Sequence, residues 1–571
     1  MRSIALAALL AGAALQLAGC GAAGTGSRAI GVSTTTAAAS TAAAAPPGTP
    51  AQSNPITVGT ALAARQVLNR ALGDTPRSLD PELATDIPSQ EVLDDLFEGL
   101  TTIDVAGNTA PGVASSWESS ADGLTWTFHL RSSARWSNGA PVTAQDFVYS
   151  WRREVNPKTG AAYAQALAPI RNALDIASGK KPLHTLGVQA LDTHTLRVNL
   201  SGPTPYLLAL LSAQYMYPVY RNAIEQYGDN WILPQHLVSN GAFTLHENVI
   251  GNRITLDKNP YYWDAAHVRL QRVAYYILPD AANQVRRFLA GGVAWTDSFP
   301  SNEYGYLKSN LGDQVVTSPF FGTFMIGMNF QRPPFKGNRA LRRSMVMAID
   351  RKPLAHYLLQ GLNQPAYTLM PPLPGYQPPL PAWAKLSDDQ RHARARALYR
   401  AAGYSRAHPL RVELDVPVEG ADARELFEAL AANWRSVLGA DVQLHEIEFK
   451  VLLEELEQHN YQMFHDSWIG DYPDPNTFME LFLTGDGNNY GAYSNPQFDQ
   501  LVEQARQATD IATRYRLFEQ AERVLDDDAA YIPYMYYSTA HLVKPYLRGW
   551  QTNVMDRNLS RYMYVLAHQG Y

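Results

Sequence analysis

The sequence predicts an α/β fold that contains more than one lobe. The chain has 571 residues, too many for one small domain, and 46% of them are hydrophobic, so several cores can be buried. Between residues 410 and 470 the apolar residues alternate, then recur at helical spacing, and then alternate again. This order of strand, helix and strand joins parallel strands by a crossover, which favours an open α/β sheet.

The elements of this region follow one another without long gaps. The apolar spacing predicts a strand at 412–416, a helix at 426–438 ended by Gly439, a strand from 442, a helix at 450–458 and a strand at 461–468. Earlier in the chain, alternation at 124–130 and 196–200 predicts two half-buried strands. A helix with an apolar face at 92–100 precedes them, and Ser89 is its expected N-cap.

Asp471 is the first candidate for a functional residue. It lies in the stretch HDSWIGDYPDPNTFME, residues 465–480, just beyond the last predicted strand. Open α/β sheets bind ligands at the carboxyl ends of their strands, and aromatic neighbours strengthen the attraction between a carboxylate and a cation. A turn-forming aspartate would fit the same proline-rich spacing, and the residues alone leave both interpretations open. We assign Asp474 to the turn.

Composition and motifs exclude several classes of function. The net charge of −6 lacks the basic character of a nucleic-acid-binding protein. Phosphate loops, nucleophile elbows and metal-ligand spacings are missing, and one G-x-G-x-x-G match at 19–24 has no strand before it. Two prolines argue against a calcium loop around Asp471. We therefore predict no metal and no cofactor.

The N-terminus predicts export and lipidation. Arg2 precedes an apolar run from Ile4 to Leu17, which is too short for a membrane span and is typical of a signal peptide. Cys20, the single cysteine, follows Leu17-Ala18-Gly19 and resembles the lipobox of bacterial lipoproteins. We predict a signal peptide at 1–19 and a lipidated tether at 20–60, rich in Ala, Thr, Ser, Gly and Pro. An ordinary secretory signal with a chance cysteine is the alternative.

Further motifs occur in a characteristic order along the chain. They are SLDP at 78–81, DLFEGL at 95–100, APGVA at 110–114, WTFHLR at 126–131, PVTAQDFVYSW at 141–151, SNGAF at 239–243, NPYYW at 259–263 and LVKP at 542–545. With these motifs the sequence resembles the oligopeptide-binding proteins of bacterial ABC importers, extracellular solute-binding protein family 5. The match covers roughly residues 65–565.

The resemblance implies the fold of type II periplasmic binding proteins, with three lobes. Lobe I would comprise residues 65–97, 223–320 and 540–571, lobe II residues 98–222, and lobe III residues 321–539. The ligand cleft would lie between two α/β lobes that close about a hinge.

The same resemblance implies the binding residues. Asp471 would pair with the α-ammonium group of a peptide, and the backbone of Ser467, Trp468, Ile469 and Gly470 would run beside the peptide as an added strand. Tyr163 matches a ligand-contacting tyrosine of lobe II.

Three departures from the family pattern concern the pocket. An acidic ligand contact of the family is Thr85 here, with Asp86 beside it, and an arginine three residues before the tryptophan is His465. The usual acidic loop in lobe I reads GGVAW at 291–295. These changes leave the length and side chains of the ligand open.

The resemblance implies a monomeric, lipid-anchored protein on the periplasmic or cell-envelope side of a bacterial membrane. It would capture oligopeptides and deliver them to an ABC permease, without catalysis. The same fold could instead bind a murein peptide, a metal chelate or haem. A secreted hydrolase using Asp471 and Asp474 is the least favoured alternative, because two carboxylates on a rigid loop would diverge.

Overall fold

The structure is a computed structural model that describes residues 58–358, 361–418 and 421–568. Cys20, the predicted signal peptide and most of the predicted tether lie outside these residues. The last residues of that tether belong to a strand instead, since β1 (Val58–Leu62) pairs antiparallel with β19 (Tyr564–His568). The ordered fold therefore begins slightly earlier than predicted.

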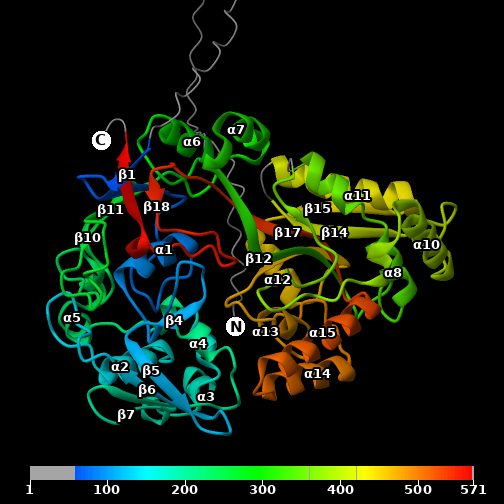
Figure 1. Cartoon of the computed structure of the whole chain (residues 1–571). Helices are drawn as coiled ribbons and strands as arrows, with labels where there is room; N and C mark the ends of the chain where they lie inside the picture. Colours follow the sequence, from blue (N-terminus) through cyan, green and yellow to red (C-terminus); the bar gives the residue numbers. More distant parts are fainter. Residues whose placement is uncertain (1–57, 359–360, 419–420, 569–571) are drawn as a thin grey trace, which may run out of the picture.

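The right-hand half in Figure 1 is built on a six-stranded mixed sheet, and we call it the large-sheet half. The order of its strands is β13-β17-β12-β16-β14-β15. Their bounds are β12 (Val315–Met328), β13 (Gln364–Pro365), β14 (Arg411–Pro417), β15 (Asp441–Ile447), β16 (Met463–Ile469) and β17 (Tyr531–Leu542).

The predicted strand–helix–strand unit is confirmed in this sheet. Strands β14 and β15 are parallel, and α11 (Ala421–Leu438) connects them. The apolar face of α11 packs on Val412, Leu414 and Val416 of β14, and Gly439 ends the helix with φ of 76°. The second predicted helix is α12 (Phe449–Glu457), which leads to β16.

Two long strands join this sheet to the rest of the molecule. β12 has 14 residues and β17 has 12, and they pair antiparallel from Val315↔Leu542 to Gly327↔Tyr531. In Figure 1 both strands run from the left-hand part of the molecule into the large-sheet half. They therefore extend across the boundaries predicted for lobe III.

The remaining four sheets form the small-sheet half, on the left in Figure 1. Their strand orders are β1-β19-β18, β2-β11-β10-β9, β3-β4 and β5-β6-β8-β7. The further bounds are β2 (Val67–Leu72), β3 (Thr101–Ile103), β4 (Thr109–Pro111), β5 (Ala114–Ser119), β6 (Thr125–Leu130), β7 (Val188–Ala190), β8 (Thr195–Asn199), β9 (Phe243–Val249), β10 (Arg253–Lys258), β11 (Arg272–Ile277) and β18 (Leu547–Arg548). The alternation at 124–130 and 196–200 thus corresponds to β6 and β8.

The first helix shows one error in the sequence prediction. α1 (Ile87–Leu96) is capped by Asp86, whose carboxylate accepts the backbone N–H of Ser89 at 2.9 Å and its hydroxyl at 2.7 Å. Ser89 is therefore inside the helix and was wrongly predicted as the cap. The proline at the second helical position suits the earlier start, because its missing N–H would have no partner there.

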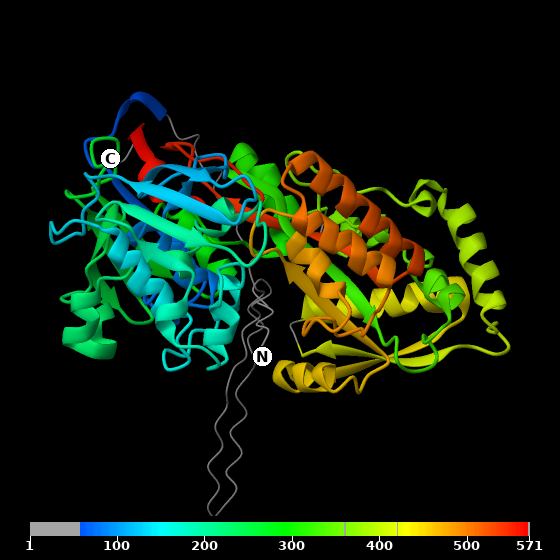
Figure 2. The same cartoon turned by 90° about the horizontal axis from the view of Figure 1, so that it is seen from below.

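The other helices cover the sheets on both sides. Figure 2 shows the orange pair α14 and α15 on one side of the large-sheet half and the yellow α12 on the opposite side. Helix bounds are α2 (Ala144–Glu154), α3 (Ala173–Ala177), α4 (Leu207–Leu210), α5 (Arg221–Tyr227), α6 (Ala281–Leu289), α7 (Tyr304–Leu311), α8 (Arg339–Met347), α9 (Arg351–Pro353), α10 (Asp388–Ala401), α13 (Asn476–Met479), α14 (Pro496–Gln507) and α15 (Ile511–Asp528). Within the three described ranges, every helix is too short or too polar to cross a bilayer.

Candidate ligand-binding site

Asp471 lies in the loop that follows the carboxyl end of β16, as predicted. The preceding residue, Gly470, donates its N–H to the carbonyl of Phe321 at 2.8 Å and so fixes the start of the loop against β12. A Cβ at Gly470 would lie 2.3 Å from the ring of Phe321, so a larger residue would displace this turn. The loop is thereby held at the end of the sheet.

The carboxylate of Asp471 is accessible but has no charged partner. Asp471 is exposed, and among the described residues no arginine, lysine or histidine forms an ion pair with its carboxylate. The surrounding protein still removes much of its hydration, and this burial raises the pKa of Asp471 to about 6. An accessible carboxylate in such a place is suited to a cationic ligand group.

One edge of β16 is open beside this carboxylate. β12 pairs with β16 along its whole length, from Met328↔Met463 to Gly322↔Ile469. On the other side, in the part of the chain that the structure describes, β14 pairs with β16 only at Met463 and Phe464. The N–H of Ser467 is bonded to the side chain of Asp466 at 2.8 Å rather than to a strand. The backbone of Ser467, Trp468 and Ile469 can therefore accept an extended ligand.

Aromatic residues of the small-sheet half lie opposite Asp471. Tyr163 stacks on Tyr215 with ring centroids 5.1 Å apart. Burial, together with the nearby charges of Asp471 and Asp86, raises the pKa of Tyr163 to about 12. Tyr163 thus lies within range of the charges of both Asp471 and Asp86, although Asp86 already accepts two hydrogen bonds from Ser89.

Tyr215 is a residue of this site that the sequence does not predict. Its side chain is 4% exposed, and its hydroxyl has no hydrogen-bond partner in the described part of the chain. Burial and the charge of Asp471 raise its pKa well above the usual value. Since Tyr215 has no fixed spacing to Asp471, the sequence carries no signal for it.

His465 lies away from the open edge and inside the large-sheet half. It is 9% exposed, and its ring lies among those of Phe324, Phe427 and Tyr534. Burial lowers its pKa to about 3, so the ring is neutral at physiological pH. His465 therefore offers no charge for a ligand carboxylate, unlike the arginine that the family pattern places there.

Asp474 does more than form a turn. It accepts the N–H of Asn476 at 2.9 Å, as a turn aspartate does, but its carboxylate also pairs with Arg514 at 2.7 and 3.1 Å. The two side chains are 6% and 0% exposed. This buried ion pair occupies the carboxylate of Asp474, so the arrangement lacks a free carboxylate pair for hydrolysis.

A contact between the two halves of the molecule lies next to Asp471. The ring of Tyr206, from the small-sheet half, stacks on that of Tyr472 with centroids 4.4 Å apart and planes 5° apart. The guanidinium of Arg514 lies 5.4 Å from the ring of Tyr206. The loop that carries Asp471 is therefore held from both sides.

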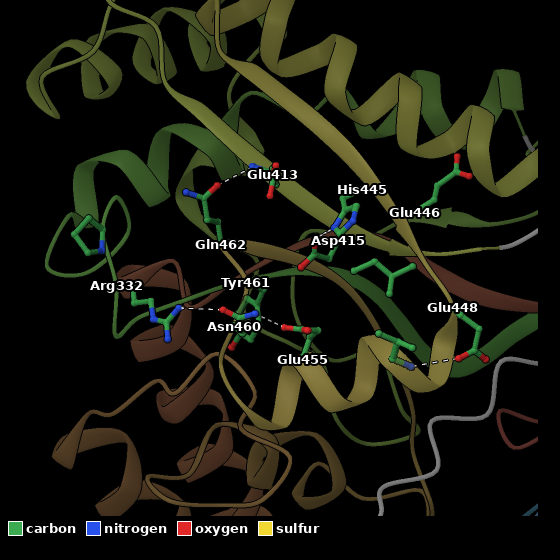
Figure 3. A pocket seen from close by; sticks show the side chains of 13 residues that line it. Arg332, Glu413, Asp415, His445, Glu446, Glu448, Glu455, Asn460, Tyr461 and Gln462 are labelled. Carbon is green, nitrogen blue, oxygen red and sulfur yellow. Dashed lines mark hydrogen bonds and ion pairs between the residues drawn. The ribbon is translucent and has the colours of Figure 1, made fainter.

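A separate cavity of about 670 Å³ lies between β14, β15 and α12. Figure 3 shows its acidic lining of Glu413, Asp415, Glu446, Glu448 and Glu455. Most of these carboxylates have partners: His445 contacts Asp415 at 3.0 Å, Arg424 contacts Glu446 at 3.2 Å, and Glu448 caps α12. Because Asp471 is accessible and has no ion-pair partner among the described residues, its loop is a stronger candidate for the ligand site than this cavity. Among the described residues no cluster of His, Cys, Asp and Glu could hold a metal ion.

The site combines an open strand edge with an accessible carboxylate at the carboxyl end of an α/β sheet. This combination is typical of a ligand-binding protein. The family model of bacterial extracellular solute-binding proteins, family 5, matches residues 108–490. The chain belongs to this family. Its fold is that of type II periplasmic binding proteins, and members of the family bind and transport solutes and are not enzymes.

Two curated relatives show how similar members differ in ligand. The periplasmic oligopeptide-binding protein OppA of Escherichia coli (strain K12) is 36% identical over 526 residues, covering 91% of this chain and 96% of OppA. The probable deoxycholate-binding periplasmic protein YgiS of the same strain is 35% identical over 523 residues, covering 91% and 97%. Sequence identity alone therefore does not fix the ligand.

Two solved structures resemble this one over nearly the whole described chain. The unliganded open form of the murein tripeptide-binding protein MppA, a protein of Escherichia coli, has a TM-score of 0.81 and 35% identity, covering 90% of this chain and all of MppA. Haemophilus influenzae OppA in complex with the peptide RPPGFSPFR has a TM-score of 0.74 and 32% identity, covering 89% of this chain and all of OppA. The TM-score is thus higher for the unliganded open form of MppA than for peptide-bound OppA.

Proposed function

We propose that the protein captures oligopeptides by their free amino terminus and delivers them to an ABC permease. The observation that carries this proposal is the carboxylate of Asp471, which is accessible and has no ion-pair partner among the described residues. An α-ammonium group would supply the missing positive charge. The similarity to OppA and MppA supports a peptide as the ligand.

The open edge of β16 supports the same ligand. A peptide that extends along Ser467–Ile469 would pair its backbone with the strand, so its side chains need not be read for affinity. Tyr163 and Tyr215 would cover the amino-terminal residue from the other half. A murein peptide also carries a free ammonium and would fit the same carboxylate.

Native mass spectrometry of the purified mature protein tests the proposal. We expect retained masses that match peptides and that are lost on denaturation. Calorimetry with synthetic peptides then measures affinity and length preference. Retention of a steroid or another ligand without an ammonium group would contradict the role given to Asp471.

Binding should close the molecule about β12 and β17. The lobes would move together over the ligand, so we expect a saturating peptide to lower the radius of gyration in small-angle X-ray scattering. Asp471→Asn at the same peptide concentration is the matched control and should compact less. An unchanged radius with peptide demonstrably bound would argue against closure.

The residue proposed to carry the membrane anchor is Cys20, which lies outside the described residues. We propose that acyl chains on Cys20 hold the mature protein at the extracytoplasmic face of the membrane. Cys20→Ala should therefore give soluble or unprocessed protein in fractionated cells, while Cys20 protein sediments with membranes. Continued sedimentation of the variant through salt washes would refute lipid anchoring.

A further inference from the structure

Thr477 lies directly behind the proposed ammonium site. It is in α13, is 0% exposed, and contacts Asp471 and Trp468 through one hydroxyl. Its oxygen accepts the indole N–H of Trp468 and the backbone N–H of Asp471, both at 3.2 Å. The hydroxyl proton points to Oδ2 of Asp471, also at 3.2 Å. One donor and two acceptor positions are thereby all used.

We infer that Thr477 is the positioning residue that orients the Asp471 carboxylate toward the ligand ammonium and favours its ionised form. The inference rests on the proposed function of Asp471. Thr477 would act through Asp471 and would not touch the ligand, because its side chain is buried. A residue of this kind is expected where a single flexible carboxylate must bind a charge without a second protein partner.

The packing around Thr477 keeps its hydroxyl in one direction. A Cβ at Gly470 would lie 3.0 Å from the methyl carbon of Thr477, so the absence of a side chain there lets the two segments approach closely. The neighbouring Phe478 packs edge-on against Phe321 with centroids 4.9 Å apart. The hydroxyl is therefore held by β12, β16 and α13 together.

The hydrogen bond from Thr477 affects the protonation of Asp471, because few other groups nearby stabilise the ionised carboxylate. Burial raises the pKa of Asp471 to about 6, and the bond from Thr477 opposes that rise. Tyr163 and Tyr215 face Asp471 from the other half, and both have raised pKa values, so they are neutral near pH 7. Glu480 is a further carboxyl group whose charge acts on that of Asp471; it is paired with Arg506 at 3.1 Å, and burial raises its pKa to about 7.

The sign of the pH effect follows from the ligand. An ammonium binds the ionised carboxylate, so affinity is complete above the pKa of Asp471 and falls about tenfold for each pH unit below it. Removing the hydroxyl should raise the pKa of Asp471 by roughly one unit. One pKa unit corresponds to about 1.4 kcal/mol, and a hydrogen bond to a charged group contributes at least this much. Relative to the wild type, binding should then weaken about twofold at pH 7, about fivefold at pH 6 and nearly tenfold at pH 5.

The experiment compares Thr477→Val with Thr477→Ser by calorimetry of peptide binding from pH 5 to 7.5. The peptide ammonium, with a pKa of about 7.7–8.0, loses part of its charge only near the upper end of this range, and it does so equally for every variant. We expect the wild-type midpoint near pH 6, a midpoint about one unit higher for Thr477→Val, and a wild-type midpoint for Thr477→Ser. At pH 6 the valine variant should bind about fivefold more weakly, whereas at pH 7.5 it should nearly match the wild type.

Controls separate this inference from its neighbours and from the proposed function. Glu480→Gln should leave the midpoint unchanged, and Thr477→Ala must reproduce Thr477→Val if the hydroxyl is the cause. An unmoved midpoint in folded Thr477→Val, with Asp471→Asn still strongly impaired, overturns the inference alone. Absence of any effect of Asp471→Asn would overturn the proposed function itself.

Discussion

Asp471→Asn should weaken the binding of a peptide with a free amino terminus by roughly 30- to 5,000-fold, or about 2–5 kcal/mol. The substitution keeps the shape of the side chain but removes its charge. If the two halves close over the ligand as proposed, they would exclude water, and the peptide ammonium would be left without its counter-ion. Among the described residues no cation pairs with Asp471. The whole loss of affinity should therefore come from the missing pair between Asp471 and the peptide ammonium.

A double-mutant cycle isolates the charge pair. The N-acetylated peptide should already bind poorly to the wild type, and Asp471→Asn should change its affinity by less than about threefold, so the two losses should be strongly non-additive. Asp389→Asn, an exposed aspartate on α10, is the matched control and should bind both peptides like the wild type. Equal weakening of free and acetylated peptides by Asp471→Asn would assign Asp471 to loop stability instead.

Asp474→Ala should lower the free energy of unfolding of the large-sheet half by about 3–5 kcal/mol. The change leaves Arg514, which is 0% exposed, as a charge in the interior without its carboxylate partner. Arg514 keeps its bond to the carbonyl of Ala505 at 2.7 Å, which does not neutralise the charge. Peptide affinity should fall as well, because Asp474 holds the loop that carries Asp471.

Urea denaturation followed by tryptophan fluorescence measures this loss. Glu428→Ala is the matched control: its partner Arg424 is 62% exposed and Glu428 itself 57%, so breaking that pair should cost less than about 1 kcal/mol. The double variant Asp474→Leu, Arg514→Met should recover part of the stability by removing both charges. A loss below about 1 kcal/mol for Asp474→Ala would show that water reaches this pair.

The contacts that the sequence did not predict have a common physical cause. Asp474 lies in a D-x-P setting, and the turn bond to Asn476 is indeed present. Its pairing with Arg514, 40 residues away, depends on how α15 packs on the loop, and no local pattern encodes that packing. The same holds for Thr477, whose role comes from the approach of α13 to Trp468 and Asp471.

His465 occupies a position whose environment differs from what the family resemblance implies. The family pattern has an arginine at this position, but here the side chain is a histidine that is buried among aromatic rings and neutral. Whether a residue at this position reaches the ligand depends on which face of β16 it occupies and how α11 covers that face. Apolar spacing predicts the strand but not the cover.

The sequence by itself determined the elements whose interactions are local: the strand–helix–strand unit around α11, the loop after β16 and the position of Asp471 at its start. It also determined the family, because the ordered motifs along most of the chain can be recognised without knowledge of the fold. The tertiary structure decided which groups meet: Asp471 opposite Tyr163 and Tyr215, and Asp474 beside Arg514. These contacts join segments far apart in the chain, and their energies depend on burial, which is a property of the packed molecule and not of any stretch of residues.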